Sequence, residues 1–223
     1  MSNYLKKIKG LIAELSSLSS ISDVVFEKGI GISSEDFMDY SKEYELAIPD
    51  EVKGFYSEFD GFKLIWNYRT NELNAANTLI EENVEILSFY NMFKGYDGRS
   101  WENEIWDEQT PMNDLSLYKR LKILDYFEKD NVHCVCIEIS KENVLTTKLW
   151  LFRQGYKPIP MTIDVTQYID KLCFTKGFWG WQYYFTNVDF SSSEFEGIKL
   201  DIQNSMAFYS KFFPEILILE SKK

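Results

Sequence analysis

The sequence predicts an α+β fold: a single domain with N-terminal helices, a central twisted antiparallel sheet, and C-terminal helices packed on that sheet. Three observations lead to this prediction. Apolar residues recur at helical spacing in the first 60 residues and again after residue 162. Between these regions, short segments are alternating or continuously apolar, as β-strands are. The connections between them are short, which favours antiparallel pairing in a meander, with a mixed sheet as the alternative.

The chain begins with two predicted helices. Residues 3–18 form an amphipathic helix, and a serine-rich segment at 16–22 ends it. Its apolar stripe consists of Tyr4, Leu5, Ile8, Leu11, Ile12, Leu15 and Leu18. Ser33 and Asp36 have the spacing of a capping box, which predicts a second helix after them. The apolar face of that helix consists of Phe37, Tyr40 and Tyr44.

Residues 47–62 carry the most specific pattern in the chain. Pro49 suits the first turn of a helix, and two acidic residues follow it at the positive end of the helix dipole. One face of this short helix is apolar, with Ile48, Val52, Phe55, Tyr56 and Phe59. Gly61 can adopt the left-handed conformation that ends the helix, and Phe62 begins an apolar run.

The middle of the chain contains five predicted strands. They are residues 62–68, 84–89, 121–127, 132–139 and 148–152. Both faces of the segment 132–139 are mainly apolar, which is typical of a central strand. A turn at 140–143 connects it to the next strand, so we expect those two strands to be antiparallel neighbours.

Helices return near the C-terminus. Residues 162–164 cap a helix whose apolar face is Val165, Tyr168, Ile169 and Leu172. An aromatic run at 179–184 alternates as a strand does, and core packing explains it best. A last helix begins at a serine cluster, where Ser193 and Glu196 have capping-box spacing, and Pro214 ends it. Its stripe consists of Phe195, Ile198, Ile202, Met206, Tyr209 and Phe213.

Composition restricts the class of partner. The chain has 223 residues, of which 45% are hydrophobic, and nothing in it marks a division into two domains. The net charge is −11, which disfavours binding to nucleic acid or to an anionic membrane and would attract a basic protein. The alternative is that this acidity only aids solubility.

The sequence favours a cytoplasmic location. No apolar run approaches the roughly 18 residues that span a bilayer, and no secretory signal follows the N-terminal lysines. Cys134, Cys136 and Cys173 are too few and too clustered for a disulfide framework.

The residues do not suggest a catalytic, cofactor or metal site. His133 and Cys134 are adjacent on a predicted strand, so they point to opposite faces and cannot act as base and nucleophile. Cys134 and Cys136 share a face, but two thiols alone fall short of a zinc site. Gly29 and Gly31 lack the third glycine and the preceding strand of a dinucleotide-binding loop. We therefore expect no enzymatic activity and no cofactor.

One loop is the candidate protein-binding site. It combines acidic side chains with large aromatic ones, which is how many protein interfaces are built. Its residues are Tyr96, Asp97, Trp101, Glu102, Glu104, Trp106, Asp107 and Glu108. The alternative is a surface loop whose two tryptophans pack into the core.

An acidic, proline-started helix that leads through Asp-Gly into a strand resembles the signature of the SUKH superfamily (the Smi/Knr-type domain). The resemblance covers residues 34 to about 185, with 1–33 as an N-terminal helix and linker and 190–223 as a C-terminal helix and tail. Family members usually have an Asn-Gly turn where this chain has Asp60-Gly61, and the segment 90–118 is longer than usual. The structural motif residues would be Ile48, Pro49, Phe55, Phe59, Asp60 and Gly61.

The resemblance implies a function without catalysis. Most characterised bacterial members of this family are immunity proteins, which bind and neutralise toxins. The acidic charge then favours a basic target, such as a toxin domain that acts on nucleic acid. The alternative is an intracellular regulatory or scaffolding module of the same fold.

Overall fold

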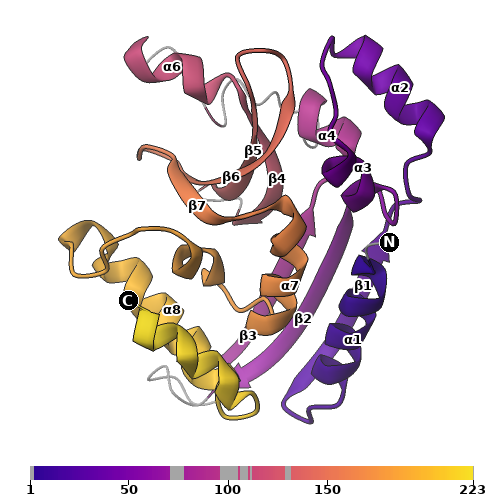
Figure 1. The fold of residues 1–223 in the computed structure, drawn as a ribbon. Helices are drawn as coiled ribbons and strands as arrows, with labels where there is room; N and C mark the ends of the chain where they lie inside the picture. The colour runs from indigo at the N-terminus through magenta and orange to yellow at the C-terminus, as the bar shows by residue number, and fades with distance from the viewer. Residues whose placement is uncertain are drawn as a thin grey trace.

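The chain folds around one seven-stranded sheet with helices at both ends of the sequence. The computed structural model describes residues 3–70, 78–95, 105, 110, 112–128 and 132–222. The strands follow the order β1-β2-β3-β4-β5-β6-β7, and every neighbouring pair is antiparallel. The predicted α+β class, the meander and the placement of the helices are confirmed (Figure 1).

The elements have the following bounds. The strands are β1 (Ile21–Lys28), β2 (Phe62–Thr70), β3 (Thr78–Ile86), β4 (Leu121–Glu128), β5 (His133–Ile139), β6 (Leu145–Arg153) and β7 (Ile159–Asp164). The α-helices are α1 (Tyr4–Ser16), α2 (Ser34–Glu43), α3 (Asp50–Tyr56), α4 (Phe89–Lys94), α6 (Met112–Tyr118), α7 (Val165–Thr175) and α8 (Glu196–Tyr209). Three 3-10 segments complete the fold: η1 (Trp181–Phe185), η2 (Ser193–Phe195) and η3 (Pro214–Lys222). Among the described segments, no helix is long and apolar enough to cross a bilayer.

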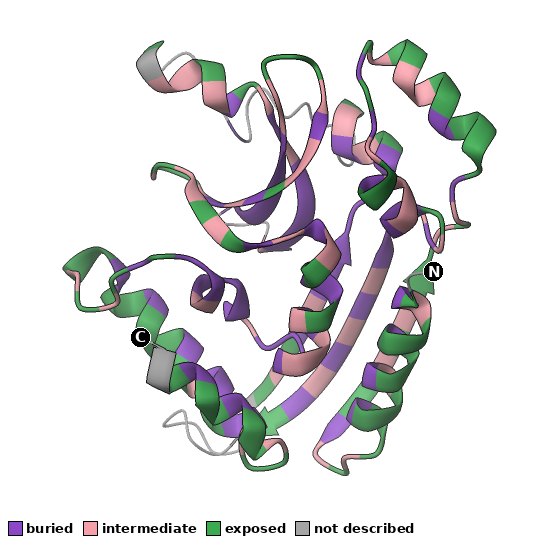
Figure 2. Cartoon of the chain, viewed as in Figure 1, coloured by how far each residue is buried: buried purple, intermediate pink, exposed green. Residues whose placement is uncertain are grey.

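Helices cover one face of β1–β3. Leu64, Trp66 and Tyr68 alternate along β2 and are buried on this face, as the alternating colours of the strand in Figure 2 show. The Trp66 indole N–H donates to the Tyr209 hydroxyl at 2.5 Å, which connects β2 to α8. Tyr68 stacks on Phe208 of the same helix at 4.1 Å between ring centroids. We call this the helical face of the sheet.

A second apolar cluster covers the opposite face of β4–β6. Its buried members are Leu87, Ile105, Tyr118, Leu121, Ile123, Tyr126, Val132, Cys134, Cys136 and Phe152. Tyr118 brings α6 onto this face, and Ile105 belongs to the chain segment that precedes α6. Strands β4 and β5 are therefore apolar on both faces, as predicted for 132–139.

The sheet has a seam between β3 and β4. These strands pair only at Ile86 and Asp125, whereas β2 and β3 pair along their whole length. The segment after α7 approaches the seam: the Trp179 backbone N–H donates to the Glu82 carboxylate, and Gln182 donates to Asp125 at 3.3 Å. Polar groups of this segment thus bond to a carboxylate on each side of the seam.

Two strands were not predicted, and one was misplaced. In β1, a bulge with Asp23 at a φ of 54° interrupts the alternation, so the serine-rich segment ends α1 but also leads directly into a strand. In β7, Pro160 obscures the strand pattern in the sequence. Proline is tolerated there because β7 lies at the edge of the sheet. The strand predicted at 84–89 is wrong in its bounds, because β3 ends at Ile86 and Phe89 begins α4.

Three further expectations near the ends of elements are wrong. The run 179–184 is not a strand, because Gly180 has a φ of 77° and the chain then forms the 3-10 segment η1, but its core packing is confirmed for Trp181 and Tyr183, each 1% exposed. Glu196 does not complete a capping box, because Ser192 caps η2 and α8 begins only at Glu196. Pro214 begins η3 instead of only ending the helix before it.

The helix that follows Pro49 begins and ends at other residues than predicted. Pro49 is the N-cap residue of α3 and not part of its first turn, and the helix ends at Tyr56. Gly61 does have a positive φ, of 74°, but this serves the turn into β2 rather than the end of α3. The predicted apolar face is confirmed, since every member is buried: Ile48, Val52, Phe55, Tyr56 and Phe59.

Candidate protein-binding surface

The motif residues meet at a corner of the sheet where β1 ends and β2 begins. The segment 29–32 runs beside the chain that leads from α3 to β2, with a hydrogen bond from the Gly29 N–H to the Gly61 carbonyl at 3.0 Å. A Cβ at Gly29 would lie 2.2 Å from the Asp60 carbonyl oxygen, and one at Gly31 would lie 2.0 Å from the Ser57 carbonyl oxygen. These two glycines therefore permit close backbone approach. A strand, β1, does precede them, contrary to the expectation, and the segment continues into α2 after Ser33.

Asp60 and Gly61 fix the start of α4 against this corner. The Phe89 backbone N–H donates to the Asp60 carboxylate at 2.6 Å, and the Ser88 hydroxyl accepts from the Asn91 N–H as the N-cap. Burial raises the pKa of Asp60, the Phe89 bond opposes that shift, and the nearby Asp36 carboxylate adds to it. The Asp-Gly pair is thus a structural joint.

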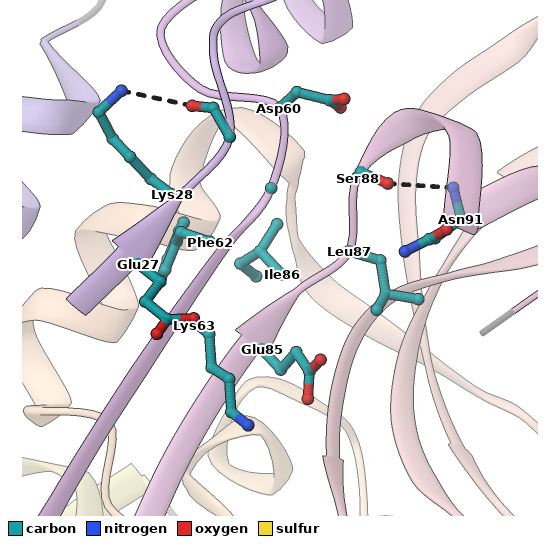
Figure 3. Close-up of a pocket in the computed structure, with 12 residues that line it drawn as sticks. Glu27, Lys28, Asp60, Phe62, Lys63, Glu85, Ile86, Leu87, Ser88 and Asn91 are labelled. Atoms are coloured by element: carbon teal, nitrogen blue, oxygen red, sulfur yellow. Dashed lines mark hydrogen bonds between the residues drawn. The ribbon is translucent and has the colours of Figure 1, made fainter. Parts of the chain in front are cut away.

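A cleft of about 300 Å³ opens between the ends of β1, β2 and β3 and the start of α4. Glu27, Lys63 and Glu85 lie directly opposite one another on the three strands, so they form one row at the cleft. Figure 3 shows the Lys63 side chain extending between the two glutamates, with Asn91 at the opposite wall. The row carries two negative charges and one positive charge.

Exposed large side chains stand beside this cleft. Ile30, between the two glycines, is 89% exposed, and Tyr90, which precedes Asn91, is 51% exposed. Tyr40 packs behind them against Phe89, with ring centroids 5.0 Å apart. Large apolar side chains next to charged groups are typical of protein-binding patches. We call the cleft with Ile30 and Tyr90 the corner surface.

The predicted binding loop follows α4 in the sequence. All eight of its candidate residues lie outside the described residues: Tyr96, Asp97, Trp101, Glu102, Glu104, Trp106, Asp107 and Glu108. The loop begins just after Gly95, the C-cap of α4, and Ile105 within it is buried in the second cluster. The prediction for this loop therefore stays a prediction.

The lone histidine and the cysteines lie on opposite faces of β5, as predicted. His133 is buried on the helical face, where its Nδ1 lies 3.0 Å from Glu128 Oε2 and the Trp179 indole N–H donates to the same oxygen at 3.2 Å. Cys134 and Cys136 lie in the second cluster with their sulfur atoms 3.7 Å apart. Within the part of the chain that the structure describes, no group of three or more His, Cys, Asp or Glu side chains could hold a metal ion.

Two carboxyl groups at the seam have strongly shifted pKa values. Burial raises the pKa of Glu82 to about 8, and the bond from the Trp179 N–H only partly opposes this. Burial also raises the pKa of Asp125 to about 6, against hydrogen bonds from Tyr168 and Gln182 that favour the ionised form. Both residues are almost fully buried, at 3% and 0% exposure. They connect the two strands of the seam to α7 and to the segment that follows it.

The sequence signal for the corner surface was incomplete. The period of two along β2 already separates the buried Phe62 and Leu64 from Lys63. Strand β1 was not predicted, so the sequence did not indicate that Glu27 and Ile30 lie beside Lys63. No model of a known protein family matches this chain, and no curated protein matches it significantly.

Proposed function

We propose that this chain is a non-catalytic, cytoplasmic immunity protein of the SUKH type, which binds one bacterial toxin domain and blocks it. The observation that carries the proposal is the corner surface. Ile30 and Tyr90 expose apolar area beside a charged cleft, on a chain with a net charge of −11. A protein partner would cover that apolar area and face the acidic surroundings with basic residues.

The arrangement of residues 47–62 supports the proposed family. Pro49 caps an acidic helix with a buried apolar face, and Asp60-Gly61 leads from it into the antiparallel sheet. This is the order of elements that the resemblance implies. The segment 90–118 is longer than the resemblance implies, and Ile105 and Tyr118 within it help to cover the second half of the sheet.

The charge supports a basic target. Attraction between oppositely charged proteins raises association rates by about 10- to 1,000-fold, and salt suppresses the gain. Toxins that act on nucleic acid need basic surfaces to bind phosphates. A nuclease or deaminase domain is therefore the target class that we propose.

Co-expression tests the proposal directly. Each toxin domain encoded beside this gene is expressed in a bacterial host, alone and together with this chain, and growth is measured. We expect this chain to restore growth with one of them, whereas an unrelated protein of similar size and negative charge does not. If no neighbouring toxin domain is neutralised, the regulatory or scaffolding alternative replaces the immunity function.

A binding measurement separates masking from other mechanisms. The neutralised toxin domain, carrying an inactivating substitution, is titrated with the purified chain by calorimetry. We expect one-to-one binding that weakens between about 0.05 M and about 0.5 M salt, because salt screens attraction between surface charges. Growth rescue without direct binding would contradict the proposed mechanism.

A further inference from the structure

The face of β1–β3 opposite the helices has an apolar centre. Val25 lies directly opposite Ile65 in the strand register, and Leu79 on β3 lies farther along the same face, opposite Arg69 and beyond the Asn67–Glu81 pair. Val25 is 46% exposed, Leu79 is 49% exposed, and Ile65 is half-buried. We call this the outer face of the sheet.

Charged residues surround that centre. The row of Glu27, Lys63 and Glu85 borders it at one end, and Glu81 and Arg69 lie toward the other end. On β1, the Asp23 carboxylate accepts a hydrogen bond from the Asn67 amide at 3.1 Å. The outer face therefore carries four acidic side chains, of which Glu85 is buried, and two basic ones.

No described helix packs on the outer face, although the corresponding face of β4–β6 is covered. There, α6 and the second cluster bury both Ile123 and Cys136 completely. On β1–β3, Val25, Ile65 and Leu79 of the outer face stay exposed or half-buried, whereas Glu85, on the strand next to β4, is buried at 7% exposure. Among the described residues, the same sheet thus has one half that α6 and apolar side chains cover and one half that they leave open.

We propose that this outer face, together with the corner surface, is where the partner protein binds; this inference rests on the proposed function. The two surfaces are continuous, because the row of Glu27, Lys63 and Glu85 belongs to both. Three strands about 4.8 Å apart and about eight residues long cover roughly 350–400 Å². A standard interface needs about 800 Å² on each partner, so an interface here also needs area from the corner surface, where Ile30 is 89% exposed.

The partner that fits this surface is a protein with basic residues around an apolar contact. The outer face exposes three acidic side chains, Asp23, Glu27 and Glu81, against Lys63 and Arg69, and the whole chain carries a charge of −11. A second copy of the chain would place these acidic rows against each other, and that repulsion disfavours a symmetric dimer. A toxin domain with a basic surface has the complementary charge.

Charge reversal on the outer face tests this assignment. The double variant Glu27→Lys/Glu81→Lys changes two exposed side chains of the face, and Glu196→Lys/Glu220→Lys makes the same charge change at exposed positions in α8 and η3. Binding of the toxin domain that the wild-type chain neutralises is measured for each. We expect the first variant to bind at least about 10-fold more weakly than the wild type and to lose growth rescue. We expect a change within about twofold for the second.

A third variant tests the apolar centre. Val25→Arg puts a cation where an apolar contact is expected, at an exposed position that should not affect folding. We expect binding to weaken about 10-fold, while the urea-unfolding midpoint of the variant stays close to that of the wild type. A lowered midpoint would show that Val25→Arg loses binding because it unfolds. In that case Val25→Thr, whose side chain has the same shape as valine, repeats the test.

The outcomes separate this inference from the proposed function. If the wild-type chain neutralises no toxin domain, the function fails and the assignment of the surface fails with it. If the wild type binds and the outer-face variants bind equally well, the function stands and this inference is overturned. If the wild-type chain instead sediments as a dimer that the outer-face variants dissociate, the occupant is a second copy, and the basic partner is wrong for this face.

Discussion

The Tyr168 hydroxyl donates a hydrogen bond to the Asp125 carboxylate at 2.6 Å, and both side chains are fully buried. This bond connects α7 to β4 at the one residue that pairs β4 with β3. Gln182 donates to the same carboxylate oxygen at 3.3 Å, and the Glu85 backbone N–H donates to the other one at 3.3 Å. Asp125 therefore holds a helix, a 3-10 segment and two strands together at the seam.

Removal of the Tyr168 hydroxyl should weaken the fold in a pH-dependent way. At about pH 8 the Asp125 carboxyl is ionised, since its pKa is raised to about 6, and we expect Tyr168→Phe to lower the free energy of unfolding by about 1.5–3 kcal/mol. At about pH 5 the group is mostly protonated, so the loss should fall to about 0.5–1.5 kcal/mol. Urea unfolding at both pH values measures this. Tyr90→Phe, at an exposed hydroxyl, is the control, and equal losses for the two variants would contradict the argument.

Glu82 should make the protein less stable as the pH rises. Its folded-state pKa of about 8 lies above the ordinary value of 4.5, so the folded state holds a proton that the unfolded chain has released between these pH values. This contribution favours folding below about pH 4.5 and is lost as the pH rises to about 8. Glu82→Gln cannot ionise. As the pH rises from about 4.5 to about 8, we therefore expect the free energy of unfolding of this variant to gain about 1–4 kcal/mol relative to that of the wild type.

The matched control for that experiment is Glu81→Gln, one residue away on the outer face and exposed. Its difference from the wild type should stay nearly constant with pH. Free energies of unfolding are measured by urea titration at half-unit pH steps. A flat difference for Glu82→Gln would show that its carboxyl is not desolvated in the folded state.

Replacement of two glycines by alanine should change the free energy of unfolding in opposite directions. Gly31→Ala places a Cβ 2.0 Å from the Ser57 carbonyl oxygen, so backbone must shift, and we expect a loss of about 1–3 kcal/mol in the free energy of unfolding. Gly10 lies in the middle of α1 with nothing within 4 Å of an added Cβ. Gly10→Ala should stabilise by about 0.5–1 kcal/mol, because alanine is the better helix former. Thermal unfolding of both variants checks the signs, and a stabilising Gly31→Ala would refute the close approach.

Helices with strong local signals were predicted well. Ser33 and Asp36 do form a capping box, and Asp164 forms another with Gln167 at the start of α7. In each helix the apolar stripe and the cap lie within a few residues, so the sequence alone contains both signals. The four predicted apolar residues of α7 are all fully buried: Val165, Tyr168, Ile169 and Leu172.

Strands β1 and β7 could not be predicted because their signals depend on the rest of the sheet. The bulge at Asp23 in β1 and Pro160 in β7 break the local pattern, and only pairing with β2 and β6 makes these segments strands. The corner surface could not be predicted either, because it includes residues at the end of β1. The core packing of the aromatic run at η1 was predicted, but its 3-10 conformation was not, because Gly180 turns the chain and no periodicity reveals that turn.

Replacement of Asp60 by asparagine tests whether the motif turn needs a charge. The Asp60 carboxylate accepts from the Phe89 N–H, and an amide oxygen can accept the same bond. Burial raises the pKa of Asp60, so its ionised form is disfavoured, and any cost of that charge is present at neutral pH and absent below the ordinary value of 3.8. Because Asp60 is partly exposed, solvent screens its charge. We therefore expect Asp60→Asn to change the free energy of unfolding by less than about 1 kcal/mol at pH 7.

Asp60→Ala, in contrast, removes the acceptor and leaves the Phe89 N–H at the start of α4 without its partner. We expect a loss of about 1–2 kcal/mol, comparable to that of a missing helix cap. Urea unfolding of the wild type and both variants at pH 7 gives the comparison. If asparagine destabilises as much as alanine, the carboxylate charge itself holds α4, and Asp-Gly is not equivalent to Asn-Gly at this turn. If only alanine destabilises, the turn requires an acceptor at this position and not a charge.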